Sequence, residues 1–242
     1  VFDKKMSFYK DANITFVGCS RWLSGRAKKS YLLRGKAVLS IPNPIDTKVY
    51  HPMDQGMARE LLGLPSGKRL LLFGALNVTD KRKGIDYLIE ALRRMEKQDV
   101  ELVVFGQVKD DIRGLFPVPI HSMGYLSDES KIVALYNAVD MFITSSLEEN
   151  LPNTIMESMA CGTPCVGFEI GGIPEMIDHR VNGYVANYKD AGDLANGIQW
   201  VLEHEDRLAL SDACVKKVQE NYTEEVVAKQ YTALYEKLLK GE

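Results

Sequence analysis

Residues 140–168 read DMFITSSLEENLPNTIMESMACGTPCVGF and decide the fold class of this chain. Two near-continuous apolar runs, 140–144 and 164–168, are typical of parallel strands that are covered on both faces. Between them, a cap at Asn153 or Thr154 begins a short helix, which ends at a glycine before the second run. A strand–helix–strand unit of this length predicts a right-handed crossover between two parallel strands.

The same alternation extends through the central part of the chain. Apolar runs at 69–73 and 100–105 predict two further strands, and each run is followed by a glycine. Residues 85–95 place their apolar side chains on one helical stripe, and Ser127 or Asp128 can cap another helix. The sequence therefore predicts an α/β fold with a doubly wound parallel sheet.

The two ends of the chain follow different patterns. Residues 15–19 and 37–41 predict two strands on either side of a basic helix over 22–33. Two strands and one helix cannot enclose a core, so they either extend the main sheet or form the end of a second domain. At the other end, Thr223 begins a helix whose apolar stripe needs a partner surface.

Composition excludes several classes of protein. A chain of 242 residues that is 45% hydrophobic and 26% charged is typical of a soluble globular protein. No apolar run approaches the roughly 20 residues that a membrane-spanning helix needs. The four cysteines are scattered and form no C-x-x-C, which argues against a disulfide framework and a zinc site. Free thiols favour a reducing compartment, and we expect a cytoplasmic protein.

The net charge of −3 conceals an asymmetry between the two parts of the chain. Residues 1–40 hold nine lysines or arginines against two aspartates, whereas the remaining residues carry a net negative charge. Such a basic segment could lie against an anionic membrane surface at the inner face of the membrane, or against nucleic acid. We favour the third interpretation, a solvated helix face, and expect no nucleic-acid partner because no aromatic residues alternate with these charges.

The loops that follow the predicted strands form the candidate site, because ligands of open parallel sheets bind beyond the carboxyl ends of the strands. Gly74 follows the first of these strands. Lys81, Arg82 and Lys83 stand just before a predicted helix, and a second helix begins near Asn153. Two helix N-termini and several cations in one crevice predict an anion site, most naturally for a diphosphate. The alternative for the three cations is a solvated charge run.

Two glutamates, Glu149 and Glu157, stand eight positions apart, one in a loop and one on the helix that follows it. A carboxylate near the start of that helix can accept two hydrogen bonds from vicinal hydroxyls such as those of a ribose. The alternative is an ordinary loop acid beside an exposed helix acid.

Several ligand-binding motifs are missing from the sequence. No G-x-G-x-x-G follows a strand, which counts against NAD and FAD, and residues 63–68 are one residue short of a P-loop. No Asp-x-Asp occurs to hold a divalent ion, and the four histidines form no H-E-x-x-H. We therefore expect no metal site.

Several blocks of sequence, in their order along nearly the whole chain, resemble the retaining glycosyltransferases of family 4, which have the GT-B fold. Residues 149–166, with their Glu-x7-Glu spacing, resemble the donor-site signature, and residues 171–175 resemble the block that follows it. Gly74 together with Lys83 resembles the phosphate-binding block. Residues 41–46 resemble the last strand of the acceptor domain and its exit.

The resemblance implies a role for each residue of the candidate donor site. Lys83 would neutralise the diphosphate of a UDP- or GDP-sugar, Glu157 would hold the ribose hydroxyls, and Glu149 would contact a hydroxyl of the donor sugar. Lys83 and Glu149 are thus the candidate catalytic residues. The other candidate donor-binding residues are Gly74 and Arg82, Gly124 and Tyr125 near the base, the backbone amides of Asn150 and Leu151 facing the sugar, and those of Asn153 and Thr154 facing the phosphate. No metal or other cofactor is implied, because preorganised cations and amides stabilise the leaving diphosphate.

Two positions depart from the pattern of that family. Ala75 stands where an arginine usually follows the strand-end glycine, and Arg82 could supply the missing charge. The loop after Glu149 usually reads Gly-Phe-Gly, whereas here it reads Asn-Leu-Pro and ends at Pro152. Because proline has no backbone N–H, one donor is missing there, which affects the choice of sugar more than phosphate binding.

The resemblance also implies how the chain divides. Residues 1–50 would be the remnant of an acceptor domain, 51–222 the donor-binding domain, and 223–242 a helix that crosses back to the acceptor domain. The protein would transfer a hexose in polysaccharide biosynthesis, with retention, to an unidentified carbohydrate or lipid-linked acceptor. Without the rest of the acceptor domain, we expect this chain to bind donor but to be inactive alone.

Two other classes of function stay open from the sequence. The chain could be another GT-B enzyme, such as a nucleotide-sugar epimerase or a phosphorylase, although no sequence context marks a pyridoxal-binding lysine. It could also be a non-catalytic nucleotide-binding module, which Ala75 slightly favours.

Overall fold

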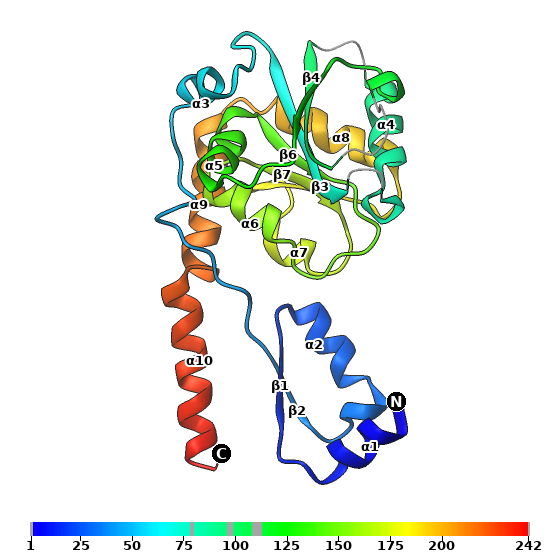
Figure 1. The fold of residues 1–242 in the computed structure, drawn as a ribbon, viewed down its shortest axis with the longest axis vertical. Helices are drawn as coiled ribbons and strands as arrows, with labels where there is room; N and C mark the ends of the chain where they lie inside the picture. The colour runs from blue at the N-terminus through cyan, green and yellow to red at the C-terminus, as the bar shows by residue number, and fades with distance from the viewer. Residues whose placement is uncertain (1, 78–79, 96–98, 108–112, 242) are drawn as a thin grey trace.

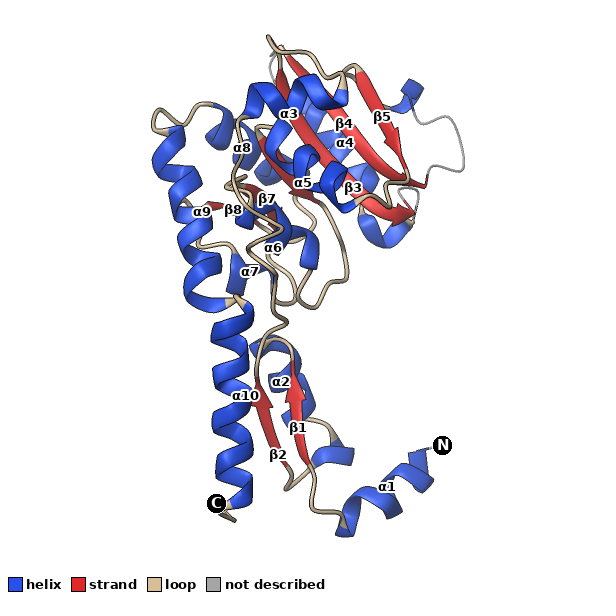
Figure 2. Cartoon of the chain, turned by 60° about the vertical axis from the view of Figure 1, so that its left-hand side comes forward, coloured by secondary structure: helices blue, strands red, loops and turns tan. Residues whose placement is uncertain are grey.

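The computed structural model describes the backbone of residues 2–77, 80–95, 99–107 and 113–241. Its main domain is built on a six-stranded parallel sheet with the strand order β5-β4-β3-β6-β7-β8. The strands are β3 (Arg69–Asn77), β4 (Val100–Gln107), β5 (Ile120–Gly124), β6 (Met141–Thr144), β7 (Cys165–Phe168) and β8 (Gly183–Ala186). Their parallel pairing confirms the predicted sheet, and it brings the carboxyl ends of β3, β4 and β5 to one edge (Figure 2).

Helices cover both faces of this sheet, so the predicted doubly wound arrangement is confirmed (Figure 1). They are α3 (Gln55–Leu62), α4 (Ile85–Arg94), α5 (Glu129–Ala138), α6 (Asn153–Ala160), α7 (Ile173–Met176), α8 (Ala191–Leu202) and α9 (Arg207–Asn221). A further helix, α10 (Glu224–Leu239), extends away from the sheet (Figure 1). Apolar residues of α4 and α8 pack with Phe73 and Phe168 in one core, whereas α5, α6 and α9 contribute to a second core around Tyr136 and Phe142. The two cores explain why the strands read as continuous apolar runs.

A switch in the winding lies between β3 and β6. These strands are neighbours in the sheet, but β3 continues into β4 on one side and β6 continues into β7 on the other. The helices that follow these strands, α4 and α6, therefore contribute to the two different cores, and open α/β sheets bind ligands at the carboxyl edge beside such a switch.

The N-terminal residues form a separate lobe below the main sheet (Figure 1). We call residues 2–41 the N-terminal lobe. It comprises α1 (Phe2–Asp11), β1 (Thr15–Gly18), α2 (Arg21–Lys28), a 3-10 turn (Tyr31–Leu33) and β2 (Ala37–Ser40). Because β1 and β2 pair only with each other among the described strands, they do not extend the main sheet, and this alternative is wrong.

The basic helix predicted over 22–33 is shorter than expected. The α-helix ends at Lys28, and the amides of Lys29 and Ser30 donate to the carbonyls of Arg26 and Ala27 in a closing turn. The chain has to reverse here so that β2 can lie parallel to β1, which a continuous helix would prevent.

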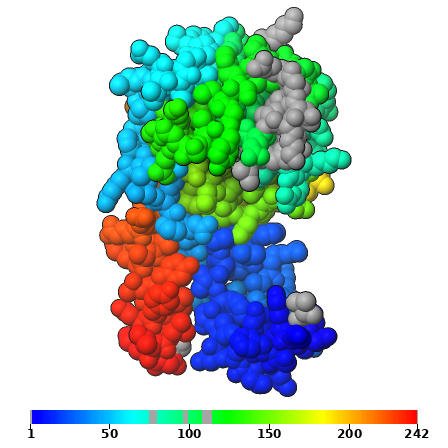
Figure 3. All heavy atoms as spheres, in the orientation of Figure 1, coloured from blue at the N-terminus to red at the C-terminus, as the bar shows by residue number. Residues whose placement is uncertain are grey.

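The last helix, α10, finds its partner surface on the N-terminal lobe. Val227 and Leu234 are buried against Ile41, and Tyr231 packs at their edge. The space-filling view shows α10 in red beside the N-terminal lobe in dark blue (Figure 3). The predicted need of this helix for a partner is thus met by the opposite end of the chain.

Candidate functional site

Two loops meet at the switch in the sheet. The loop after β3 ends in a 3-10 turn, Lys81–Lys83, and the loop after β6 begins at Ser145. The Ser145 hydroxyl donates to the carbonyl of Lys83 at 2.9 Å, and the amide of Leu147 donates to the carbonyl of Arg82 at 2.7 Å. These bonds fix the cationic turn against the loop that carries Glu149.

Gly84 makes this contact possible. Its φ is +64°, which is unfavourable for residues with a Cβ, and it is the left-handed residue just before α4. A Cβ here would lie 2.0 Å from the carbonyl oxygen of Ser145. Only glycine therefore allows the two loops to approach this closely.

The two candidate catalytic residues form an ion pair at the switch in the sheet. The Nζ atom of Lys83 lies 2.6 Å from Oε1 of Glu149, and the two side chains are 32% and 15% exposed. This ion pair is partly shielded, and both side chains keep some surface open to solvent. An anion can bind beside Lys83 while Glu149 accepts hydrogen bonds from hydroxyls.

Arg82 lies beside this pair but has a partner of its own. Its guanidinium contacts Asp80 at 2.7 Å and holds the pKa of that carboxyl at about 2, mainly through their side-chain hydrogen bonds. Its side chain is 69% exposed. The charge of Arg82 is therefore already compensated in this structure. Ala75, where the family pattern has arginine, lies on β3, and its side chain is outside the described residues.

The N-terminus of α6 opens toward the same edge. Pro152 occupies the cap position and makes no side-chain hydrogen bond, so the predicted caps at Asn153 and Thr154 are wrong. The reason is local: both residues already lie inside the helix, and proline has no side-chain acceptor. The first-turn amides of α6 thus lack a side-chain cap, and such a helix end favours anions.

Glu157 lies one turn further along α6. Its Oε2 accepts a hydrogen bond of 2.8 Å from the Tyr136 hydroxyl. Burial raises the pKa of Glu157, repulsion from Glu129 adds to this, and the Tyr136 hydrogen bond partly opposes it. Glu157 and Asn153 border a pocket of about 190 Å³. The other lining residues are Pro44, Ile45, Asp46, Tyr50, Glu129 and Met156.

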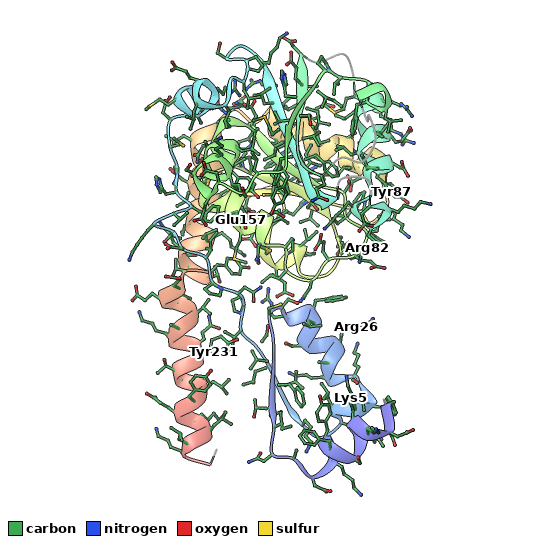
Figure 4. The ribbon with its side chains drawn as sticks, viewed as in Figure 1. Lys5, Arg26, Arg82, Tyr87, Glu157 and Tyr231 are labelled. Atoms are coloured by element: carbon green, nitrogen blue, oxygen red, sulfur yellow. The ribbon has the colours of Figure 1, made fainter. Side chains whose placement is uncertain are left out.

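Arg82 and Glu157 both lie in the half of the main domain that is nearer the N-terminal lobe (Figure 4). In that view they lie apart, with Glu157 to the left of Arg82.

Gly74, which is expected just after a strand, lies within β3, because this strand extends to Asn77, whereas Gly124 and Tyr125 lie at the end of β5. A Cβ on Gly74 would lie 1.9 Å from the ring of Phe105, so the packing of β4 alone requires glycine there. Gly124 ends β5 with a φ of +64°, and Tyr125 is 61% exposed. Since β5 is the edge strand, these two lie two strands away from β3.

The side chains of Asn150 and Leu151 both make contacts within the protein. The side chain of Leu151 is buried in the core, and the side-chain amide of Asn150 bonds to Cys19 and Ser20 in the N-terminal lobe. Their backbone is held from the other side, because Gly172 N–H donates to the carbonyl of Asn150 at 2.5 Å. This role of Gly172 is not apparent from the sequence pattern.

Metal-ligand clusters and membrane-spanning helices are both absent from the described residues. In the part of the chain that the structure describes, no three His, Cys, Asp or Glu side chains gather as metal ligands do. Among the same residues, no helix combines the length and apolar character needed to cross a bilayer.

Comparison with known proteins places these features in a family. The model of the family "Glycosyl transferases group 1" matches residues 67–204. The N-acetyl-alpha-D-glucosaminyl L-malate synthase of Bacillus anthracis is 24% identical over 213 residues, which are 86% of this chain and 55% of that protein. The chain spans about half the length of the curated relatives it matches.

Solved structures share the fold. Sucrose-phosphate synthase from Thermosynechococcus elongatus superposes with a TM-score of 0.83 at 22% identity, covering all of this chain and 62% of that one. HepE from Anabaena in complex with UDP-glucose gives a TM-score of 0.77 at 19% identity, over 97% of this chain and 68% of that one.

The resemblance predicted from the sequence is thus confirmed, and the main domain is the Rossmann-like domain of a GT-B glycosyltransferase. The chain belongs to the family of group 1 glycosyl transferases.

Proposed function

We propose that this chain is the donor-binding part of a glycosyltransferase and that it holds a nucleoside diphosphate sugar at the carboxyl edge of the sheet, beside the switch between β3 and β6. The observation that carries the proposal is the partly shielded Lys83–Glu149 pair at the switch in the sheet, close to the uncapped N-terminus of α6. A cation, helix amides and an accessible carboxylate are what a sugar diphosphate requires of a site.

Each group takes one part of the donor. Lys83 neutralises the charge of the diphosphate, together with the first-turn amides of Asn153 and Thr154. Glu149 accepts a hydrogen bond from a hydroxyl of the sugar. Glu157, which borders its own pocket, accepts hydrogen bonds from the ribose hydroxyls. Negative charge develops on the diphosphate as the glycosidic bond to it breaks, and fixed positive groups stabilise that charge without a metal. The donor is a UDP- or GDP-sugar; UDP-glucose is the ligand in the HepE complex.

Isothermal titration of the chain with UDP and GDP, in the presence of EDTA, tests the donor site. We expect Lys83→Ala and Glu157→Ala each to weaken the preferred nucleotide by roughly 10- to 100-fold, because each removes a hydrogen bond involving a charged group. Lys81→Ala is the matched control, since it removes a neighbouring cation of the same turn. Equal affinities in all four proteins would refute the proposed site.

Transfer itself requires more than this site. We infer a retaining transfer to a carbohydrate or lipid-linked acceptor, and we infer that the 242-residue chain binds donor but does not complete multiple turnovers alone. The half-length match to the curated relatives supports the second inference. Incubation with the bound nucleotide sugar and acceptor sugars, followed by product analysis, tests it, and sustained product formation would contradict it.

We also propose that the N-terminal lobe touches an anionic membrane. Trp22 and Arg26 lie along one exposed stripe of α2, the exposed Lys29 follows at its C-cap, and the guanidinium of Arg26 lies 5.8 Å from the centroid of the Trp22 ring. Lys5 of α1 lies on the same side of the lobe as Arg26 (Figure 4). Aromatic rings beside cations are typical of surfaces that bind the interface of an anionic bilayer.

Cosedimentation with vesicles of phosphatidylcholine, with and without phosphatidylglycerol, tests this surface. The protein is expected to sediment with the anionic vesicles, and Arg26→Glu/Lys29→Glu to bind at least about tenfold more weakly, since each charge near the surface contributes about 1 kcal/mol. Lys216→Glu/Lys237→Glu on α9 and α10 carries the same charge change as a control. The surface would be ruled out if the protein bound neutral and anionic vesicles equally, or if the control variant lost as much vesicle binding as Arg26→Glu/Lys29→Glu.

A further inference from the structure

A carboxylate of the main domain caps a helix of the N-terminal lobe. Glu175 on α7 accepts hydrogen bonds from the amides of Arg21 at 2.8 Å and Trp22 at 2.7 Å, the first two residues of α2. The Arg21 Nε atom adds a third contact at 3.2 Å. The Glu175 side chain is only 17% exposed. Helix N-termini attract negative charge, so this contact binds the two parts of the molecule together.

Asn150 makes a second contact across the same boundary. Its Oδ1 accepts from the Ser20 hydroxyl at 2.6 Å, and its Nδ2 donates to Sγ of Cys19 at 2.9 Å. The Ser20 hydroxyl in turn accepts from the amide of Leu23 and so caps α2 itself. Asn150 therefore reaches the same helix end as Glu175, from the loop that carries Glu149.

A backbone hydrogen bond joins the two loops that carry these contacts. Gly172 N–H donates to the carbonyl of Asn150, and Gly172 is the residue before α7, which carries Glu175. At Gly171, with a φ of +58°, a Cβ would lie 1.9 Å from the carbonyl oxygen of Glu149. At Gly172, a Cβ would lie 2.3 Å from the carbonyl oxygen of Asn150. The loops after β6 and β7 thus have little room to move independently.

We propose that Asn150 and Glu175 form an interlobe latch, which ties the N-terminus of α2 to the loop of Glu149. The latch holds that loop in position only while the N-terminal lobe is engaged. Neither side chain binds the donor; both are positioning residues. Where the family pattern usually has glycine, Asn150 supplies the side chain that makes the second contact.

Amide hydrogen exchange tests the latch without any donor. In Glu175→Ala, the amides of Arg21 and Trp22 lose their acceptors, and we expect their exchange to accelerate by about tenfold or more. Glu175→Gln keeps one carbonyl acceptor and should give an intermediate rate. Lys217→Gln is the matched control, because Lys217 pairs with Asp178 within the main domain at 2.8 Å and does not reach α2.

The decisive variant is Asn150→Ala. Asn150 does not touch the amides of Arg21 and Trp22, so their exchange accelerates in this variant only if the two contacts act as one unit. Unchanged exchange of these amides in Asn150→Ala, with a normal melting temperature, would show two independent contacts and overturn the latch.

The effect on the donor is a separate measurement, and it rests on the proposed function. UDP and UDP-glucose serve as probes. The latch variants are expected to bind UDP with an affinity within about twofold of the wild type, but to lose the additional affinity that the wild type has for UDP-glucose over UDP. A parallel loss of both ligands in these variants would contradict the positioning role. If the wild-type chain binds neither probe, the proposed donor is wrong, and the exchange experiment still decides the latch.

Discussion

Replacing Asp140 by alanine is expected to lower the free energy of unfolding by about 3–5 kcal/mol, because it leaves a buried arginine without its counter-charge. The Asp140 side chain is 2% exposed, and Arg59, whose side chain is 6% exposed, contacts it at 3.1 Å. Asp140 also accepts from the amide of Leu70 at 2.7 Å and from Arg207 at 2.6 Å. One carboxylate therefore joins α3, β3 and α9 at the amino end of the sheet.

Chemical denaturation of the variant measures this loss. Asp99→Ala is the matched control, because Asp99 pairs with Lys68 but its side chain is 72% exposed, and such surface pairs contribute about 1 kcal/mol or less. If both variants lowered the free energy of unfolding by a similar, small amount, other groups would be compensating the charge of Arg59. Its remaining contacts are to backbone carbonyls of Pro65, Ser66, Lys68 and Ala138.

Gly84→Ala is expected to destabilise the protein by about 2–5 kcal/mol and to weaken nucleotide binding at the same time. A left-handed φ costs an alanine about 1–2 kcal/mol, and the overlap with the Ser145 carbonyl adds about 1–3 kcal/mol. The overlap is with backbone, so the turn of Lys83 has to move away from the loop of Glu149. The two halves of the proposed donor site would then separate.

Two other glycines isolate the causes of this effect. Gly35 has a φ of +79°, and a Cβ added there would have no neighbouring atom within 4 Å, so Gly35→Ala reports the backbone strain alone. Gly67 has neither a left-handed φ nor a close neighbour, and Gly67→Ala should be nearly neutral. Thermal unfolding and UDP titration of the three variants measure stability and binding separately. If Gly35→Ala and Gly84→Ala lowered the melting temperature and the UDP affinity equally, the contact between the two loops would be unimportant.

The strands of the main sheet that the sequence predicts are those with nearly uniform burial. The runs 69–73, 100–105, 140–144 and 164–168 coincide, to within one residue at their starts, with strands of the main sheet, because both faces of these strands are covered and their apolar runs are uninterrupted. The strands β5 and β8 are not predicted from the sequence pattern. The first reads IHSMG and lies at the sheet edge, and the second reads GYVA and has only four residues.

The residue types of the candidate site could be predicted from the sequence, but its contacts could not. Post-strand glycines, a cationic turn and a helix start point to the carboxyl edge of the sheet from the sequence alone. The pairing of Lys83 with Glu149 joins residues that are 66 positions apart, and only the neighbouring placement of β3 and β6 brings them together. The compensation of Arg82 by Asp80, and the turn of Asn150 toward Ser20, likewise depend on side-chain directions that no spacing specifies.

The packing of Ile41 against α10 also has a consequence for biosynthesis. Val227 and Leu234, which cover Ile41, leave the ribosome only after every strand of the main sheet has been translated. Until then an apolar patch on the N-terminal lobe stays open to water, and nascent segments of this kind are prone to aggregate or to recruit chaperones. The N-terminal lobe is synthesised before the main sheet, but it completes its folding only when α10 has been synthesised, after the main sheet.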